Sequence, residues 1–111
     1  TGKIYRYARD IQKSLPRTKA LVLPIPESAE VGEIYRLLEN LYLEGQKQED
    51  TFFHLRGAVF VGDIPLPRIR SQFGEMVSLF PYTDFESPAF LWDETISVFR
   101  ENPESLLFQP E

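Results

Sequence analysis

The sequence predicts an α/β fold built on a βαβ unit, with a small and mainly parallel sheet covered by helices and a C-terminal antiparallel hairpin. Apolar runs at residues 19–25 and 56–61 flank an amphipathic helical pattern, which predicts the βαβ unit. Two further short apolar runs, at residues 89–92 and 96–99, predict the hairpin. We expect a single α/β domain over residues 1–111.

This domain divides into four parts. We expect a basic amphipathic helix over residues 1–18, the βαβ core over 19–67, short strands and the hairpin over 68–101, and a tail over 102–111. A chain of 111 residues with 42% hydrophobic residues can bury one modest core.

The first helix has a charge opposite to that of the rest of the chain. Apolar residues recur at helical spacing over residues 3–15, and Pro16 ends the pattern. Residues 1–19 carry six basic side chains and one acidic one, a net charge of +5; because the whole chain carries −5, the remainder carries −10. Such a helix suits contact with nucleic acid or an acidic membrane surface. We favour instead a solvated helix face, or a helix lying on the acidic remainder.

The βαβ core consists of two apolar runs and the helix between them. In residues 19–25 Pro24 limits the first run, since proline cannot donate to a sheet ladder. Pro26 opens the helix, whose apolar stripe we expect to end at Gly45. Residues 56–61 are apolar on both faces, as is typical of a central parallel strand covered on two sides.

Asp63 is the first candidate site residue. It follows Gly62 at the expected carboxyl end of a buried strand, where open α/β sheets bind ligands. A carboxylate there suits a cation, or it caps the turn before Pro65 by accepting backbone N–H groups, which is the interpretation we favour. A receiver-like Mg²⁺ site would need a Lys at a neighbouring strand end, and the sequence places none there.

The composition excludes several chemistries. The chain has no cysteine, so it has no thiolate nucleophile, and its single histidine, His54, has no evident catalytic partner. We expect no catalytic residue in this chain. We also expect no membrane span, and the acidic body argues against nucleic-acid binding.

Acidic and aromatic residues gather in the segment that follows. Asp84 and Asp93 bracket an aromatic stretch, and two or three carboxylates held close together suit Ca²⁺. The spacing of an EF-hand loop is absent, so we expect no cofactor and keep calcium as a lesser alternative. The aromatic side chains suit either an exposed contact patch or core packing, and the sequence does not separate the two. These side chains are Tyr82, Phe85, Phe90 and Trp92.

Three pieces taken in order resemble the front part of gingipain-like cysteine peptidases, which have a caspase-like fold. Residues 61–65 read Val-Gly-Asp-Ile-Pro and match that family's strand end, preceded by the strand at 19–25 and the helix. The downstream motif resembles residues 83–93 more loosely, with Thr83 in place of Ser. By this analogy the chain is a piece of a larger three-layer fold of the caspase-like or Rossmann-like kind. Asp63 and Asp84 would then lie near the carboxyl edge of its sheet.

The resemblance implies a non-catalytic role. The family's catalytic His and Cys lie on later strands, and its Gly-Arg-hydrophobic-Pro tetrapeptide does not occur here. We therefore expect a non-catalytic N-terminal subdomain of a gingipain-like peptidase, or of an inactive relative, supporting a catalytic half outside this chain. The alternative is an interaction or scaffold module of a large surface or exported protein, using residues 82–93. The expected partners are the remainder of the parent protein or another protein, and the resemblance alone suggests the cell surface.

Overall fold

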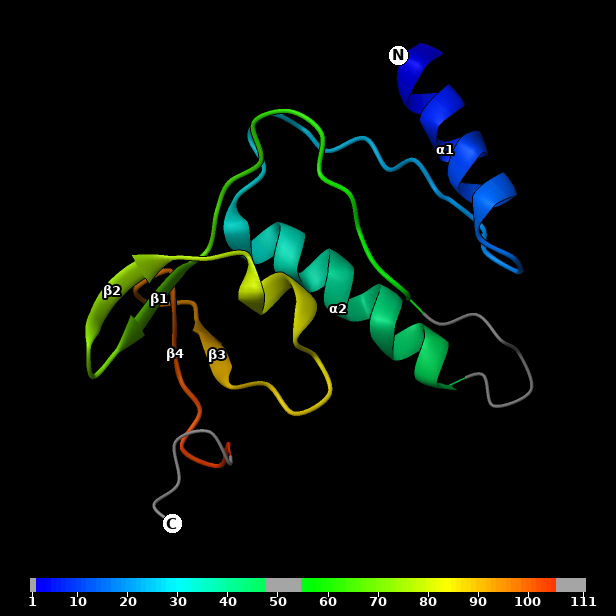
Figure 1. The fold of residues 1–111 in the computed structure, drawn as a ribbon. Coiled ribbons are helices and arrows are strands. Elements are labelled where there is room, and N and C mark those ends of the chain that lie inside the picture. Colours follow the sequence, from blue (N-terminus) through cyan, green and yellow to red (C-terminus); the bar gives the residue numbers. More distant parts are fainter. Residues whose placement is uncertain (1, 48–54, 106–111) are drawn as a thin grey trace.

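The computed structural model describes residues 2–47 and 55–105, which form helices and one mixed sheet. The general α/β class is therefore confirmed. In chain order the elements are α1 (Gly2–Ser14), α2 (Val31–Lys47), β1 (Arg68–Ser71), β2 (Gly74–Val77), the 3-10 helix η1 (Phe80–Thr83), β3 (Phe90–Asp93) and β4 (Val98–Glu101), as Figure 1 shows.

The sheet is assembled entirely from the C-terminal half of the described chain. Its strand order is β2-β1-β4-β3, with antiparallel outer pairs and a parallel central pair in which Ile69 lies opposite Phe99. Strands β3 and β4 form the predicted antiparallel hairpin, with Trp92 opposite Phe99. Strands β1 and β2 form a second hairpin closed by the two-residue loop of Gln72 and Phe73, a length that favours antiparallel pairing.

Helix α2 supplies the main cover of the sheet. The Glu33 carboxylate accepts a hydrogen bond from the Glu30 backbone N–H at 3.3 Å, which satisfies one of the free donors at the helix start. The predicted apolar stripe faces inward, and Ile34 and Leu38 are buried. Gly45 was expected to end the helix, but α2 continues to Lys47 with Gly45 buried within it. A glycine inside a helix costs only about 1 kcal/mol relative to alanine, so it does not have to end the helix.

The core lies between α2, η1 and the two central strands. Its most buried side chain is Phe99, at 0% exposure, and Tyr35 meets it edge to face with 5.0 Å between ring centroids. This arrangement is typical of aromatic pairs in protein interiors. The buried cluster comprises Ala29, Ile34, Tyr35, Leu38, Ile69, Tyr82 and Phe99.

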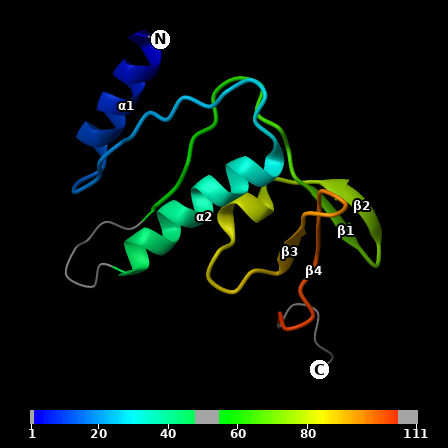
Figure 2. The same cartoon turned by 180° about the vertical axis from the view of Figure 1, so that it is seen from behind.

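The prediction of a parallel βαβ sheet is wrong, because neither of its two strands forms. Residues 19–25 and 56–61 form no strand in the structure, although they lie on either side of α2 in the sequence as expected. The two segments run in the same direction and come side by side toward their C-terminal ends, as both Figure 1 and Figure 2 show. A parallel pair is less stable than an antiparallel one, and two strands alone are marginal in water. The described chain places no third strand beside them.

Helix α1 occupies part of the span 1–18 expected for it, ending at Ser14, and stands apart from the body. Both views of the fold show it separated from α2 and the sheet (Figures 1 and 2). None of its residues is buried, so the expectation of a helix lying on the acidic remainder is wrong. No helix in the described part of the chain is both long enough and apolar enough to cross a bilayer.

Candidate functional site

Asp63 lies in a tight surface turn. The Ile64 backbone N–H donates to the Gly62 carbonyl at 3.1 Å, so the backbone itself closes the turn. Gly62 has a φ of 93°, a conformation that glycine adopts readily. The Asp63 side chain is exposed. Residues 56–61 form no strand. The prediction that Asp63 lies at the carboxyl end of a sheet strand is therefore wrong.

Asp84 and Asp93 hold loops together. The Asp84 Oδ2 atom accepts a hydrogen bond from the Ala89 N–H at 2.8 Å, which fixes the approach to β3. In the hairpin turn the Asp93 Oδ1 atom accepts one from the Thr95 N–H at 3.0 Å, and Oδ2 lies 3.4 Å from the Arg100 guanidinium. Carboxylates of this kind satisfy backbone donors where no ladder partner is available. Both side chains therefore have a structural role within the described chain.

The three aspartates are not brought together. Among the described residues, no group of three or more His, Asp or Glu side chains is placed to hold a metal ion. Calcium binding by Asp63, Asp84 and Asp93 stays a prediction. The described residues do not place these three carboxylates in one ligand set. His54 lies outside the described residues.

Tyr82 belongs to the core. It is 2% exposed, its hydroxyl donates to the Pro65 carbonyl at 2.9 Å, and its ring lies 5.5 Å from that of Phe60. Burial raises the pKa of Tyr82 to about 12. The ring is therefore not available to a partner on the surface. Instead it ties the segment at 56–65 to η1.

The other three aromatic candidates also pack inward. Phe85, Phe90 and Trp92 are partly buried against the core cluster. An interaction role for them stays a prediction that applies only to their exposed edges. The ring contacts, measured between centroids, are Phe85 with Tyr35 at 5.6 Å and with Tyr42 at 5.7 Å, Phe90 with Phe80 at 6.2 Å, and Trp92 with Phe99 at 5.0 Å.

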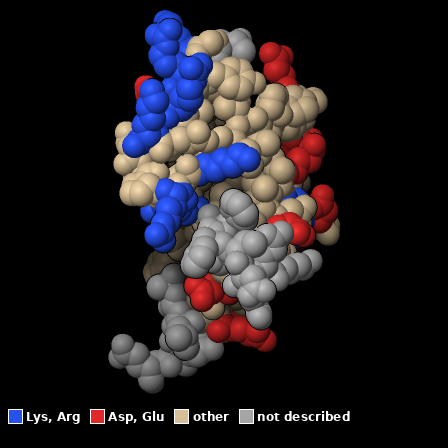
Figure 3. All heavy atoms as spheres, turned by 90° about the vertical axis from the view of Figure 1, so that its right-hand side faces the viewer, with Lys and Arg blue, Asp and Glu red and all other residues tan. Residues whose placement is uncertain are grey.

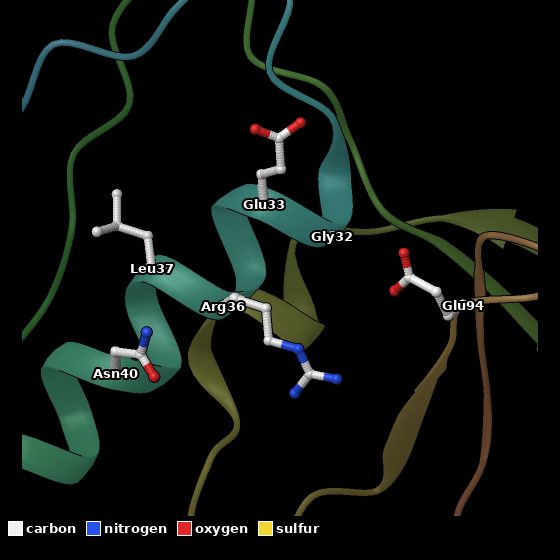
Figure 4. Close-up of a pocket in the computed structure, with 6 residues that line it drawn as sticks. All are labelled: Gly32, Glu33, Arg36, Leu37, Asn40 and Glu94. Carbon is white, nitrogen blue, oxygen red and sulfur yellow. The ribbon is translucent and has the colours of Figure 1, made fainter.

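A shallow depression of about 460 Å³ lies between α2 and the β3–β4 turn. Figure 4 shows its lining side chains spread along the helix, with Arg36 and Glu94 on opposite sides and Glu33 directed away from both. Arg36 pairs with Glu39 at 2.8 Å and is largely solvated. The polar groups therefore do not converge on one point, as they would in a catalytic pocket.

The floor of this region is tightly packed. A Cβ atom added at Gly32 would lie 3.0 Å from the Trp92 ring, so glycine lets α2 approach β3 closely. Beneath it, burial and then the neighbouring Glu39 carboxylate raise the pKa of Tyr35. The depression is therefore formed by the packing of α2 on β3, with ordinary surface charges at its rim.

The clearest exposed apolar feature lies on the two segments that failed to pair. We call four of their side chains the outer apolar set: Leu21, Leu23, Val59 and Val61, which are 63%, 46%, 61% and 57% exposed. The side chains between them turn the other way, and Phe60 packs against the core cluster while Val22 is half-buried. This alternation has the period of a strand. Arg56 donates a hydrogen bond to the Thr18 hydroxyl at 2.6 Å and links the beginnings of the two segments.

The outer apolar set is not among the site residues predicted from the sequence. A signal was present, because residues 56–61 are apolar on both faces and such a run predicts cover on both. The structure covers one face, through Phe60, and leaves Val59 and Val61 in contact with solvent.

A scan against protein-family models, and searches of curated proteins and of solved structures, found no match for this chain.

Proposed function

We propose that this chain is a non-catalytic interaction module, which docks through the outer apolar set against another part of its parent protein. One observation carries the proposal: over residues 20–23 and 59–61, partly buried side chains alternate with apolar side chains left exposed. Segments of this pattern are normally covered on both faces. A covering strand or helix would bury Leu21, Leu23, Val59 and Val61 together.

Magnitudes favour a partner in the same polypeptide. Burying one Val or Leu side chain completely contributes about 1.5–3 kcal/mol, so covering four half-exposed ones contributes a few kcal/mol. Association of two separate molecules costs about 4–15 kcal/mol in lost freedom, which this set would barely offset. Docking within one chain avoids most of that cost because the effective concentration is high. The remainder of the parent protein is therefore the better occupant.

The resemblance to gingipain-like peptidases gives this module a specific context. The Val-Gly-Asp-Ile-Pro sequence at residues 61–65 directly follows the second segment of the outer apolar set. In that context the chain is a front subdomain that supports a catalytic half, whose larger three-layer sheet the two segments would join. The alternative context is a scaffold module of a large surface or exported protein. Both use the same docking side chains, and the presence of a downstream His and Cys in the parent sequence separates them.

The test compares this chain alone with the chain fused to the polypeptide encoded directly after it. Val59→Asp with Val61→Asp places two charges where docking would bury them, which is unfavourable without partners. We expect this variant to lower the unfolding midpoint of the fused protein and to expose its junction to protease. In the chain alone the same variant should unfold like the unchanged protein.

A matched control is available on β2. Met76 and Val77 are 61% and 53% exposed, close to the values for Val59 and Val61, but lie outside the outer apolar set. Met76→Asp with Val77→Asp should leave the fused protein as stable as the unchanged one. Equal effects of the two double variants would contradict the proposal, and so would a stop codon directly after Glu111.

A further inference from the structure

Helix α1 presents an apolar face that the described chain covers only in part, because Ala8 and Ile11 are half-buried and the other apolar side chains are exposed. Ile4, Tyr5 and Tyr7 are 37%, 49% and 52% exposed, and Leu15 directly after the helix is 45% exposed. The Leu15 N–H donates to the Ile11 carbonyl at 2.9 Å, so Leu15 continues the helical geometry. At 3.6 residues per turn, Ile4, Ile11 and Leu15 share one face. Apolar side chains exposed along a helix face are costly in water unless something covers them.

Tyrosines border this apolar face, and basic side chains occupy the opposite face of the helix. The helical angle places Tyr5 and Tyr7 at the two borders of the apolar face, one on each side. The opposite face carries the positive charge of the helix, and its basic residues are Lys3, Arg6, Arg9 and Lys13. Figure 3 shows Lys and Arg gathered mainly in the upper part of one side of the molecule, with Asp and Glu along its margin and lower part.

The connection to the body leaves the helix projecting. Pro16 follows α1, and Arg17 adopts a left-handed backbone with φ of 57°, which turns the chain sharply. A side-chain hydrogen bond reaches back, from the Ala20 N–H to the Gln12 Oε1 atom at 2.8 Å. The helix is thus placed beside the start of the 19–25 segment while its apolar face stays open.

We propose that α1 is an interfacial helix that lies on an anionic lipid surface, with Ile4, Ile11 and Leu15 in the headgroup layer. An apolar face, tyrosines at its borders and basic residues beyond them are the arrangement of helices that lie in a membrane interface. The charge of +5 on residues 1–19 complements anionic headgroups, whereas the acidic body is repelled and held away. Nucleic acid would leave the apolar face uncovered. A protein groove that accepts a helix is filled by large anchors, and Ala8 lies in the middle of this face.

The inference is independent of the docking proposed for the outer apolar set. Flotation of the whole chain with vesicles tests it, using phosphatidylcholine mixed with phosphatidylglycerol and, separately, phosphatidylcholine alone. We expect binding to the mixed vesicles, weaker binding at high salt because the charges are screened, and little binding to the neutral vesicles.

Two variants separate the apolar and the basic contributions. Ile4→Gln with Ile11→Gln keeps a good helix former at each position and should reduce partitioning at least about tenfold. Lys3→Gln with Arg9→Gln should reduce it about 25-fold, since each basic residue near an anionic surface contributes about fivefold. Because α1 buries no residue, both variants should keep the unfolding midpoint of the unchanged chain.

The matched control removes the same charge elsewhere. Arg68 and Arg70 lie on β1 with side chains 65% and 51% exposed, and Arg68→Gln with Arg70→Gln should leave vesicle binding unchanged. The proposal is overturned if anionic vesicles do not bind the chain, or if this control weakens binding as much as the α1 variants do. It is also overturned if the Ile4→Gln, Ile11→Gln variant binds vesicles normally. A further contradicting result would be a dimer of the unchanged chain that this variant converts to monomer, because the apolar face would then be a contact between two copies.

Discussion

The two central strands of the sheet and the two unpaired segments differ in how far they bury their apolar side chains. Strand β1 contains one apolar residue, Ile69, and it is 4% exposed; β4 contains two, and Phe99 is fully buried. The segments at 19–25 and 56–61 are richer in apolar residues, yet the outer apolar set is about half exposed. Burial here depends on whether an opposing surface is present.

This difference separates a self-sufficient region from a dependent one. The sheet closes its core with α2 and η1 and satisfies its turns with Asp84 and Asp93. The two segments supply only their inner side chains to that core and leave the others for a partner. We therefore expect changes in the first region to alter the stability of the isolated chain, and changes in the second to alter its association.

The largest effect should come from Phe99. Phe99→Ala removes a fully buried ring that meets both Tyr35 and Trp92, and we expect it to lower the free energy of unfolding by about 3–5 kcal/mol. Urea denaturation measures this change. Phe73→Ala, at an 88% exposed position, is the control and should change it by less than about 0.5 kcal/mol. A small effect at Phe99 would mean that the sheet does not hold the core.

A smaller effect should appear at Tyr82. Its pKa is raised to about 12 from the ordinary 10.0, so the unfolded chain loses this proton first as the pH rises. The stabilisation is fully present below pH 10 and is lost toward pH 12, so the free energy of unfolding falls across that interval. Denaturation at several alkaline pH values measures the fall, and ultraviolet absorbance reports tyrosinate formation.

Tyr82→Phe gives the corresponding variant. It should reduce the alkaline fall, leaving the part due to Tyr35, whose pKa burial also raises. Near neutral pH it should cost about 1 kcal/mol through loss of the hydrogen bond to the Pro65 carbonyl. An alkaline fall identical to that of the unchanged chain would show that Tyr82 is not buried as described.

The smallest effect should come from the outer apolar set. In the isolated chain, Val59→Asp with Val61→Asp should change the free energy of unfolding by less than about 0.5 kcal/mol for each substitution, because both side chains face solvent. Urea denaturation again measures it. A loss of several kcal/mol would place these side chains in the core and erase the distinction between the two regions.

Much of the fold was predictable from the sequence, and the errors have physical causes. Both helices and the β3–β4 hairpin follow from the apolar pattern, which indicates the type of local structure even in α1, where no residue is buried. Strand β1 was missed because Arg-Ile-Arg-Ser presents a single apolar side chain, too few to show alternation. The segments at 19–25 and 56–61 have strand-like sequences, but a strand also needs a paired neighbour, and no local pattern reports whether one is present.

The candidate site was less predictable. Asp84 and Asp93 were singled out as carboxylates near aromatic rings, whereas their loop-closing hydrogen bonds to Ala89 and Thr95 depend on backbone geometry that the sequence does not express. The burial of Tyr82 depends on long-range contact with Phe60, 22 positions earlier in the sequence. Composition alone could not distinguish an exposed aromatic patch from core packing.

Amide hydrogen exchange tests the central claim most directly, by comparing the chain alone with the chain fused to the polypeptide that follows it. In the isolated chain, amides of the central strands β1 and β4 should exchange slowly and those of residues 19–25 and 56–61 quickly, since the segments lack ladder partners. In the fused protein both segments should become protected, while the sheet is unchanged. Equal, rapid exchange of the segments in both proteins would contradict the docking role.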